Sequence, residues 1–156
     1  MNFIQQLPSP IGTLTIEADD HHLLRIDLHT REVLERPNAI TQTTVELLKA
    51  YFRSEIPDFS TLPFCWPKAP FYARVLQTLL KSDYGTRLSY GELAALAGRA
   101  KAHRAAAAAV ARNPFAVAIP CHRIVHASGG VGAYGWGPAK KAWLLHHETI
   151  DLQMDQ

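Results

Sequence analysis

The stretch Ile119-Pro120-Cys121-His122-Arg123-Ile124-Val125 sets one of the chain's two cysteines beside a histidine and an arginine. Pro120 fixes its own φ angle and pushes Ile119 toward an extended conformation, with apolar residues on both sides. We therefore expect Cys121 at the stiff end of a buried strand. Cationic neighbours favour the thiolate, which is the nucleophilic form of cysteine. From these residues alone, the alternative is a small buried cysteine that serves only as core.

Composition indicates a globular, soluble chain. With 47% hydrophobic and 19% charged residues among 156, the chain can form one packed domain or two small ones. No apolar run approaches the roughly 20 residues that cross a bilayer. Residues 1–14 lack the basic start and apolar core of a signal peptide, so we expect a cytoplasmic protein. Cys65 and Cys121 are too few for a disulfide framework, and no ligand cluster argues for a metal site or cofactor.

Charge is concentrated in the second half of the chain. Residues 1–70 hold six basic and nine acidic side chains, whereas residues 71–156 hold ten basic and five acidic ones. Between Tyr84 and His147 there are eight Lys and Arg against Glu92 alone, a net charge of +7. Such a positive field suits a polyanion such as DNA. A solvated basic face without a partner is the alternative.

The first part of the chain predicts a small α/β domain over residues 1–69. Residues 9–28 alternate apolar and polar side chains around a turn at residues 19–22, which indicates an antiparallel hairpin. A helix is expected from about Thr41 to Arg53, with residues 43–46 as its capping box. Four prolines mark residues 56–70 as a linker whose aromatic residues pack down. Cys65 in this linker is interpreted as packed rather than functional.

The second part predicts a mainly helical domain over residues 70–156. Pro70 suits the start of a helix, and Ser89 and Glu92 form a capping box that opens a short second helix. A third helix, residues 101–112, ends before Pro114, so that the second and third helices form a helix-turn-helix. Pro138 then begins a last helix that runs to Glu148.

Two segments of this domain suit close contact with another molecule. The run of five alanines at residues 105–109 has a smooth surface that approaches another body closely, with basic residues around it that can hold phosphates. Alternatively, these alanines pack against a neighbouring helix. Residues 128–137 contain five glycines with Tyr134 and Trp136, which permits a tight loop next to a flat ligand.

Together these motifs resemble one family. Pro120-Cys121-His122-Arg123 resembles the active-site signature of the O6-alkylguanine-DNA alkyltransferases, and matching segments lie at residues 9–14, 89–94, 112–114, 132–134, 141 and 144–148. The resemblance covers nearly the whole chain. It implies direct-reversal repair by a monomer without a cofactor, in which the alkyl group of O6-alkylguanine in duplex DNA passes irreversibly to Cys121. The base is flipped out from the minor-groove side, and each molecule acts once.

The resemblance also implies roles for individual residues. Cys121 is the nucleophile, activated through a water by His122, which Glu148 orients, while Asn113 holds the turn. Arg104 enters the base stack in place of the extruded base. The base-binding residues are Tyr90, Ile124, Tyr134, Gly135, Trp136 and Lys141, and the pocket is lined by Ile124 and the loop from Val131 to Gly135. The DNA-binding residues are Arg104, Lys101, Ala105, Ala108, Arg112 and Arg123.

Two positions depart from the family pattern. Ala107-Ala108 stands where many relatives have two glycines, which could hold the helix slightly off the groove. Trp136 stands where several relatives have glycine, and a bulky indole there predicts a narrow pocket that accepts methyl better than benzyl groups.

Three other functions fit parts of the sequence. Relatives that bind alkylated DNA without repairing it lack the cysteine, which this chain has. A cysteine hydrolase could use Cys121, a histidine and Glu148, but the basic field would then have no use. A helix-turn-helix transcription regulator normally reads base edges with polar side chains, and residues 105–109 offer none.

Overall fold

The computed structural model describes residues 2–29, 31–128, 130 and 132–154. The chain divides into two compact units. The first comprises Met1–Trp66 with Pro114–Ala118, and the second comprises Pro67–Asn113 with Ile119–Gln156. The predicted fold class, α/β with a mainly helical second half, is confirmed. The inclusion of Pro114–Ala118 in the first unit was not predicted.

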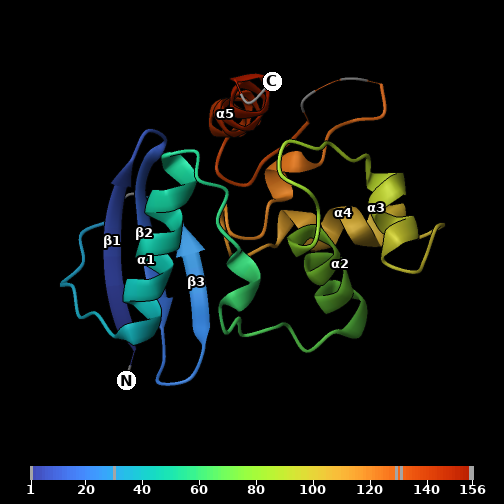
Figure 1. Ribbon diagram of the computed structural model, residues 1–156. Helices are drawn as coiled ribbons and strands as arrows, with labels where there is room; N and C mark the ends of the chain where they lie inside the picture. The colour runs from blue at the N-terminus through green and yellow to red at the C-terminus, as the bar shows by residue number, and fades with distance from the viewer. Residues whose placement is uncertain (1, 30, 129, 131, 155–156) are drawn as a thin grey trace. The chain divides into compact units, whose positions relative to one another are not determined.

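The first unit is built on a three-stranded antiparallel sheet of order β1-β2-β3 (Figure 1). Its strands are β1 (Phe3–Ser9), β2 (Gly12–Ala18) and β3 (Leu23–Asp27). The predicted hairpin corresponds to β2 and β3, whose Ile16 and Ile26 pair in register and are fully buried. Strand β1 was not predicted. Its Pro8 argues against a strand, but β1 lies at the sheet edge, where a missing N–H is tolerated.

Helix α1 (Ala39–Phe52) covers one face of the sheet over β1 and β2 (Figure 1). Its cap is Asn38, whose side chain accepts a hydrogen bond from Thr41 N while the Thr41 hydroxyl accepts one from Asn38 N, both at 2.9 Å. The predicted capping box at residues 43–46 is therefore wrong. Those residues lie inside the helix, where the Thr44 hydroxyl donates to Ile40 O at 2.8 Å.

The linker after α1 packs down as expected. It contains a short 3-10 helix, η1 (Phe59–Thr61), and it buries Phe59, Leu62 and Phe64. The prediction that Cys65 is packed is wrong, because its side chain is exposed. Residues 63–65 run extended beside Leu23, with Cys65 N donating to Leu23 O at 2.9 Å. Neighbours on an extended chain face opposite sides, so a buried Phe64 turns Cys65 outward.

Segment Pro114–Ala118 bonds to the edge of β3. Ile26 N donates to Pro114 O at 2.9 Å and Ala116 N donates to Ile26 O at 3.0 Å. Val117 then takes φ +68°, which is rare for a β-branched residue, and Ala118 N donates to Ala116 O to close a γ-turn. The expected buried strand before Cys121 is therefore wrong, because the chain turns twice here.

The second unit contains α2 (Pro70–Leu80), α3 (Tyr90–Leu96), α4 (His103–Ala111), a 3-10 helix η2 (Cys121–Arg123) and α5 (Pro138–Met154). The predicted capping box of α3 is present, with Glu92 N donating to Ser89 Oγ at 3.1 Å and Ser89 N to Glu92 Oε1 at 3.0 Å. Helices α2, α3 and α4 pack together (Figure 1). Among the described residues, no helix has the length and apolar character needed to span a membrane.

The alanine run of α4 has two different faces. Ala106 and Ala109 are buried, on the helix that packs against α2 and α3. Ala105 and Ala108 are exposed. One face of α4 therefore belongs to the core, while the other presents small side chains to an approaching partner.

Candidate active site

Cys121 begins η2 at a sharp change of chain direction. Cys121 N donates to Ile119 O at 2.8 Å around Pro120, whose φ of −82° and ψ of 64° describe an inverse γ-turn. Arg123 N then donates to Pro120 O at 3.0 Å. Because the backbone turns here, Cys121 and His122 escape the opposite-face rule of a regular strand. Only 3% of the Cys121 surface is exposed.

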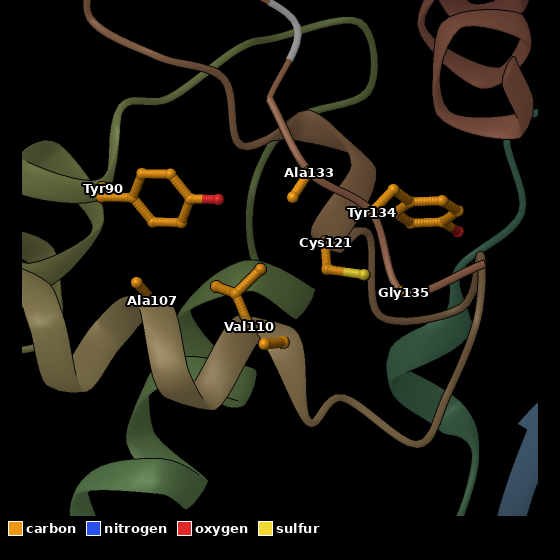
Figure 2. Close-up of a pocket in the computed structure, with 8 residues that line it drawn as sticks. Tyr90, Ala107, Val110, Cys121, Ala133, Tyr134 and Gly135 are labelled. Atoms are coloured by element: carbon orange, nitrogen blue, oxygen red, sulfur yellow. The ribbon is translucent and has the colours of Figure 1, made fainter. Parts of the chain in front are cut away.

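A cavity of about 170 Å³ opens beside Cys121 (Figure 2). The Tyr90 ring from α3 and the Tyr134 ring from the loop before α5 lie on opposite sides of it (Figure 2). Its walls are largely apolar, and several of its side chains are no larger than a methyl group. The cavity can therefore accept a flat apolar face. The complete lining consists of Tyr90, Ala107, Val110, Ala111, Cys121, Ala133, Tyr134 and Gly135.

His122, the residue directly after Cys121, forms a buried pair with Glu148. His122 Nε2 lies 2.5 Å from Glu148 Oε2, and Glu148 Oε1 accepts hydrogen bonds from Arg123 Nε at 2.8 Å and from Gly85 N at 2.9 Å. Burial alone opposes ionisation of this carboxyl, but the bonds from His122 and Arg123 hold its pKa well below the usual range. Glu148 is therefore a fixed carboxylate at neutral pH.

The His122 ring is poised as a base. Burial lowers its pKa, and the nearby Glu148 carboxylate offsets this only in part, so that the imidazole is neutral at pH 7. With Nε2–H donated to Glu148, the lone pair lies on Nδ1. His122 Nδ1 is buried and has no hydrogen-bond partner among the described residues. It is the atom that can accept a proton.

The Cys121 thiol is protonated at rest. Burial raises its pKa to about 11, while a hydrogen bond from Asn113 and the charge of Lys141 act in the opposite direction. The expectation that His122 and Arg123 favour the thiolate is wrong, because His122 is neutral and the Arg123 guanidinium is bonded elsewhere. The thiol therefore needs a base at the moment it reacts.

Asn113 holds the turn before the cysteine. Its Nδ2 donates to Ile119 O at 2.9 Å, and the side chain also bonds to Cys121. Because Asn113 is buried, its amide is fixed by these bonds rather than by solvent.

Arg123 lies inside the second unit. Only 7% of its surface is exposed, and Nη1 donates to Ser82 O at 2.8 Å and to Ser82 Oγ at 2.9 Å in addition to the bond with Glu148. We expected this arginine to contact DNA. The structure argues against that expectation, because the guanidinium is enclosed and its Nε and Nη1 donors are bonded to Glu148 and Ser82. Arg123 instead positions the Glu148 carboxylate.

Three residues expected to bind the extruded base lie outside the cavity lining. Lys141, 1% exposed, donates from Nζ to Ile124 O and, at 3.1 Å, to Ala133 O, so that it ties the cysteine turn to the following loop. Ile124 is fully buried. Trp136 packs against the Tyr134 ring with centroids 5.3 Å apart and planes at 63°. Trp136 therefore does not line the cavity itself, and its effect on the size of alkyl group accepted stays a prediction. Val131 lies outside the described residues.

The residues expected to bind DNA, other than Arg123, are exposed around α4. Arg112 lies over the Tyr72 ring, with Cζ 5.1 Å from its centroid, and the Tyr72 hydroxyl donates to Arg112 O. Arg104 lies on the first turn of α4. The exposed set consists of Lys101, Arg104, Ala105, Ala108 and Arg112. Among the described residues, no group of three His, Cys, Asp or Glu side chains could hold a metal ion.

The chain matches proteins of one family. The family model for the DNA-binding domain of 6-O-methylguanine DNA methyltransferase matches residues 70–150. The mouse methylated-DNA–protein-cysteine methyltransferase is 42% identical over 169 residues, covering 92% of this chain and 80% of the mouse protein. The chain belongs to the 6-O-methylguanine DNA methyltransferase family.

Solved structures of this family share the fold along the whole chain. The crystal structure of Mycobacterium tuberculosis O6-methylguanine methyltransferase is 31% identical, with a TM-score of 0.84 and 100% coverage of both chains. The M. tuberculosis OGT in complex with DNA is 32% identical, with a TM-score of 0.82 over 98% of this chain and 99% of that one.

Several residues of the site were not predicted from the sequence. Ser82 and Gly85 lie before α3, in a segment that reads only as a helix break, yet they bond to Arg123 and Glu148. Their contributions come largely from backbone atoms, which leave no pattern in a sequence. The cavity lining adds Val110 and Ala111, whose small apolar side chains also carry no chemical signal. Ala133 belongs to the loop that was predicted to line the pocket.

Proposed function

We propose that this chain repairs alkylated DNA by moving an alkyl group from O6 of guanine to the Cys121 sulfur. The observation that carries the proposal is a protonated thiol on the wall of an apolar cavity, next to a neutral buried histidine with a free acceptor atom. Family membership supports the same chemistry, since relatives are named methylated-DNA–protein-cysteine methyltransferases. The family member bound to DNA supports DNA as the partner.

The transfer is an in-line displacement. His122 Nδ1 takes the thiol proton, through a water as the resemblance implies, and Glu148 stabilises the imidazolium that forms. The thiolate then attacks the alkyl carbon. An S–C bond forms, the C–O6 bond breaks, and its electron pair stays on the purine. Guanine regains a proton at N1, and the Tyr90 hydroxyl is suited to hydrogen-bond the leaving base.

The base has to leave the helix before it can react. Chemistry on a stacked, paired base is out of reach, so the nucleotide is flipped into the cavity at a cost of a few kcal/mol. The exposed alanines of α4 suit a close approach to the minor groove, where contact is mainly to the backbone. Arg104, exposed on the first turn of α4, is suited to fill the space that the base vacates.

Each molecule is expected to act once. A thioether has no good leaving group, and the described cavity lining contains no second thiol or amine that could remove the alkyl group. Alkylated Cys121 is therefore the end state. The monomeric state and the cytoplasmic location stay predictions.

The test is a mass measurement after mixing with duplex DNA that contains one O6-methylguanine. We expect one methyl group on the Cys121 peptide, at a stoichiometry of one per protein. Cys121→Ser should abolish the transfer, whereas Cys65→Ser, which removes the exposed second cysteine, should leave it intact. A folded wild-type protein that binds this DNA without gaining mass would contradict the proposal and favour a non-catalytic lesion binder.

A further inference from the structure

Two arginines lie within cation–π distance of a single aromatic ring at the start of α2. Arg99 Cζ lies 5.0 Å from the centroid of the Phe71 ring, and Arg74 Cζ lies 5.6 Å from it. Arg74 follows Phe71 by three residues on the same helix, which places both on one face. Arg99 belongs to the turn between α3 and α4. We call these three residues the Phe71 clamp.

The charges of the clamp are not neutralised within the protein. Arg74 and Arg99 are both exposed, and neither forms an ion pair with any residue that the structure describes. Glu92, the acidic residue of α3, has its carboxylate bonded to Ser89 N in the cap. The two guanidinium groups therefore keep their full positive charge at the surface.

The clamp also restricts the arginines before any partner binds. A free arginine has many rotamers, and fixing it on binding is unfavourable. Stacking on an aromatic face limits that freedom while the N–H donors at the edge of the guanidinium stay available. Such a group suits phosphate, which it can bind through two parallel hydrogen bonds.

One arginine of the clamp, Arg99, lies close in sequence to the residues proposed to bind DNA. Arg99 precedes Lys101 by two residues and Arg104 by five, and its contact with Phe71 brings the start of α2 to this turn. We infer that Arg74 and Arg99 bind two DNA phosphates and so extend the DNA-binding surface from α4 onto α2. This inference rests on the proposed function, and it concerns affinity for duplex DNA rather than the chemical step.

The experiment measures Kd for a lesion-free duplex as a function of salt, with wild-type protein and the double variant Arg74→Gln/Arg99→Gln. Each phosphate contact contributes about 0.9 to the slope of log K against log salt, so the variant should lose about 1.8 from that slope. The Kd of the double variant divided by that of wild type should therefore be about tenfold smaller at ~0.2 M salt than at ~0.05 M salt. Methyl transfer at saturating DNA should keep its wild-type rate constant.

Two further variants separate binding from packing. Phe71→Leu keeps both charges but removes the stacking face, so Kd should weaken while the salt slope stays within about 0.5 of wild type. Arg36→Gln is the matched control, because Arg36 also lies over an aromatic ring, Phe3, at 4.8 Å, but in the first unit. It should leave both Kd and slope unchanged. Melting curves of all variants check the fold.

The outcomes distinguish the two proposals. If wild type binds the duplex with a salt-dependent Kd and the double variant has the same slope, the clamp only packs α2 and the inference fails alone. If the double variant and Arg36→Gln lower the slope of log K against log salt by the same amount, the change reflects the protein's overall positive charge, and the inference also fails. If wild type shows no duplex binding at low salt, the inference and the proposed function fail together.

Discussion

Arg123 Nε donates to Glu148 Oε1 at 2.8 Å, so the arginine of the cysteine motif serves the carboxylate of α5. Through the same carboxylate it reaches His122, whose Nε2 lies 2.5 Å from Glu148 Oε2. The motif thus places a thiol, a neutral imidazole and the arginine that holds the Glu148 carboxylate at three consecutive positions. Glu148 is the group that connects the base to the positioning residue.

Removing the charge of Arg123 should damage stability and chemistry but not DNA binding. Arg123→Gln leaves a buried carboxylate without its cation, and breaking a buried pair in this way costs about 3–5 kcal/mol. We expect a lower melting temperature and a transfer rate reduced by about tenfold or more, since Glu148 then stabilises the imidazolium less well. Single-turnover rates and duplex Kd report the two effects. Arg112→Gln, at an exposed arginine, should weaken the duplex Kd but leave the melting temperature and the transfer rate unchanged. If Arg123→Gln also weakened the duplex Kd, Arg123 would be a DNA contact after all.

The transfer rate should be nearly independent of pH around neutrality. His122 is neutral there because burial lowers its pKa, and it should lose its activity as a base only when the pH falls below that lowered pKa. In His122→Asn the thiol has no base, so the rate should be low at pH 7 and rise about tenfold per pH unit toward about 11. Single-turnover profiles of both proteins check this. A wild-type rate that climbs in the same way would mean that His122 does not take the proton.

Folding stability should decline on both sides of neutrality. The Cys121 pKa is raised from 9.0 to about 11, so the folded state favours the thiol, and this contribution is lost as the pH rises through that range. Two pKa units correspond to about 3 kcal/mol for this buried group. The pKa values of His122 and Glu148 are lowered, so their contributions are present at neutral pH and are lost as the pH falls below about 6.5 and about 4.5 respectively. Cys121→Ser should flatten the alkaline decline in melting temperature and leave the acid side unchanged.

Pocket selectivity should respond to Ala107 rather than to Trp136. Ala107 lines the cavity, so Ala107→Val should slow O6-benzylguanine more than O6-methylguanine. Trp136 packs against the Tyr134 ring and is not part of the cavity lining, so Trp136→Gly should slow both substrates by similar factors through a looser Tyr134 ring. The ratio of the two single-turnover rates is the measurement. If Trp136→Gly raised the rate with O6-benzylguanine relative to that with O6-methylguanine, the indole would limit the pocket after all.

Much of the fold was predictable because local rules and tertiary packing agree. The capping box of α3, the proline at the start of α2 and the alternation of β2 and β3 depend on near neighbours. Prediction failed where a distant partner decided the outcome. Strand β1 is held by its pairing with β2 despite Pro8, and Phe64 determines which way Cys65 faces.

The sequence by itself determined the reactive residue types, their spacing and the family. Tertiary structure alone decided how those residues work. Burial sets the charge state of each group, because it keeps Cys121 as a thiol and His122 neutral. The sequence alone, with a histidine and an arginine next to the cysteine, favours a thiolate. Packing also places the Arg123 guanidinium beside Glu148 inside the unit rather than at the surface. The physical reason is that desolvation and hydrogen-bond partners depend on what surrounds a side chain in space, and most of those surroundings come from distant parts of the chain.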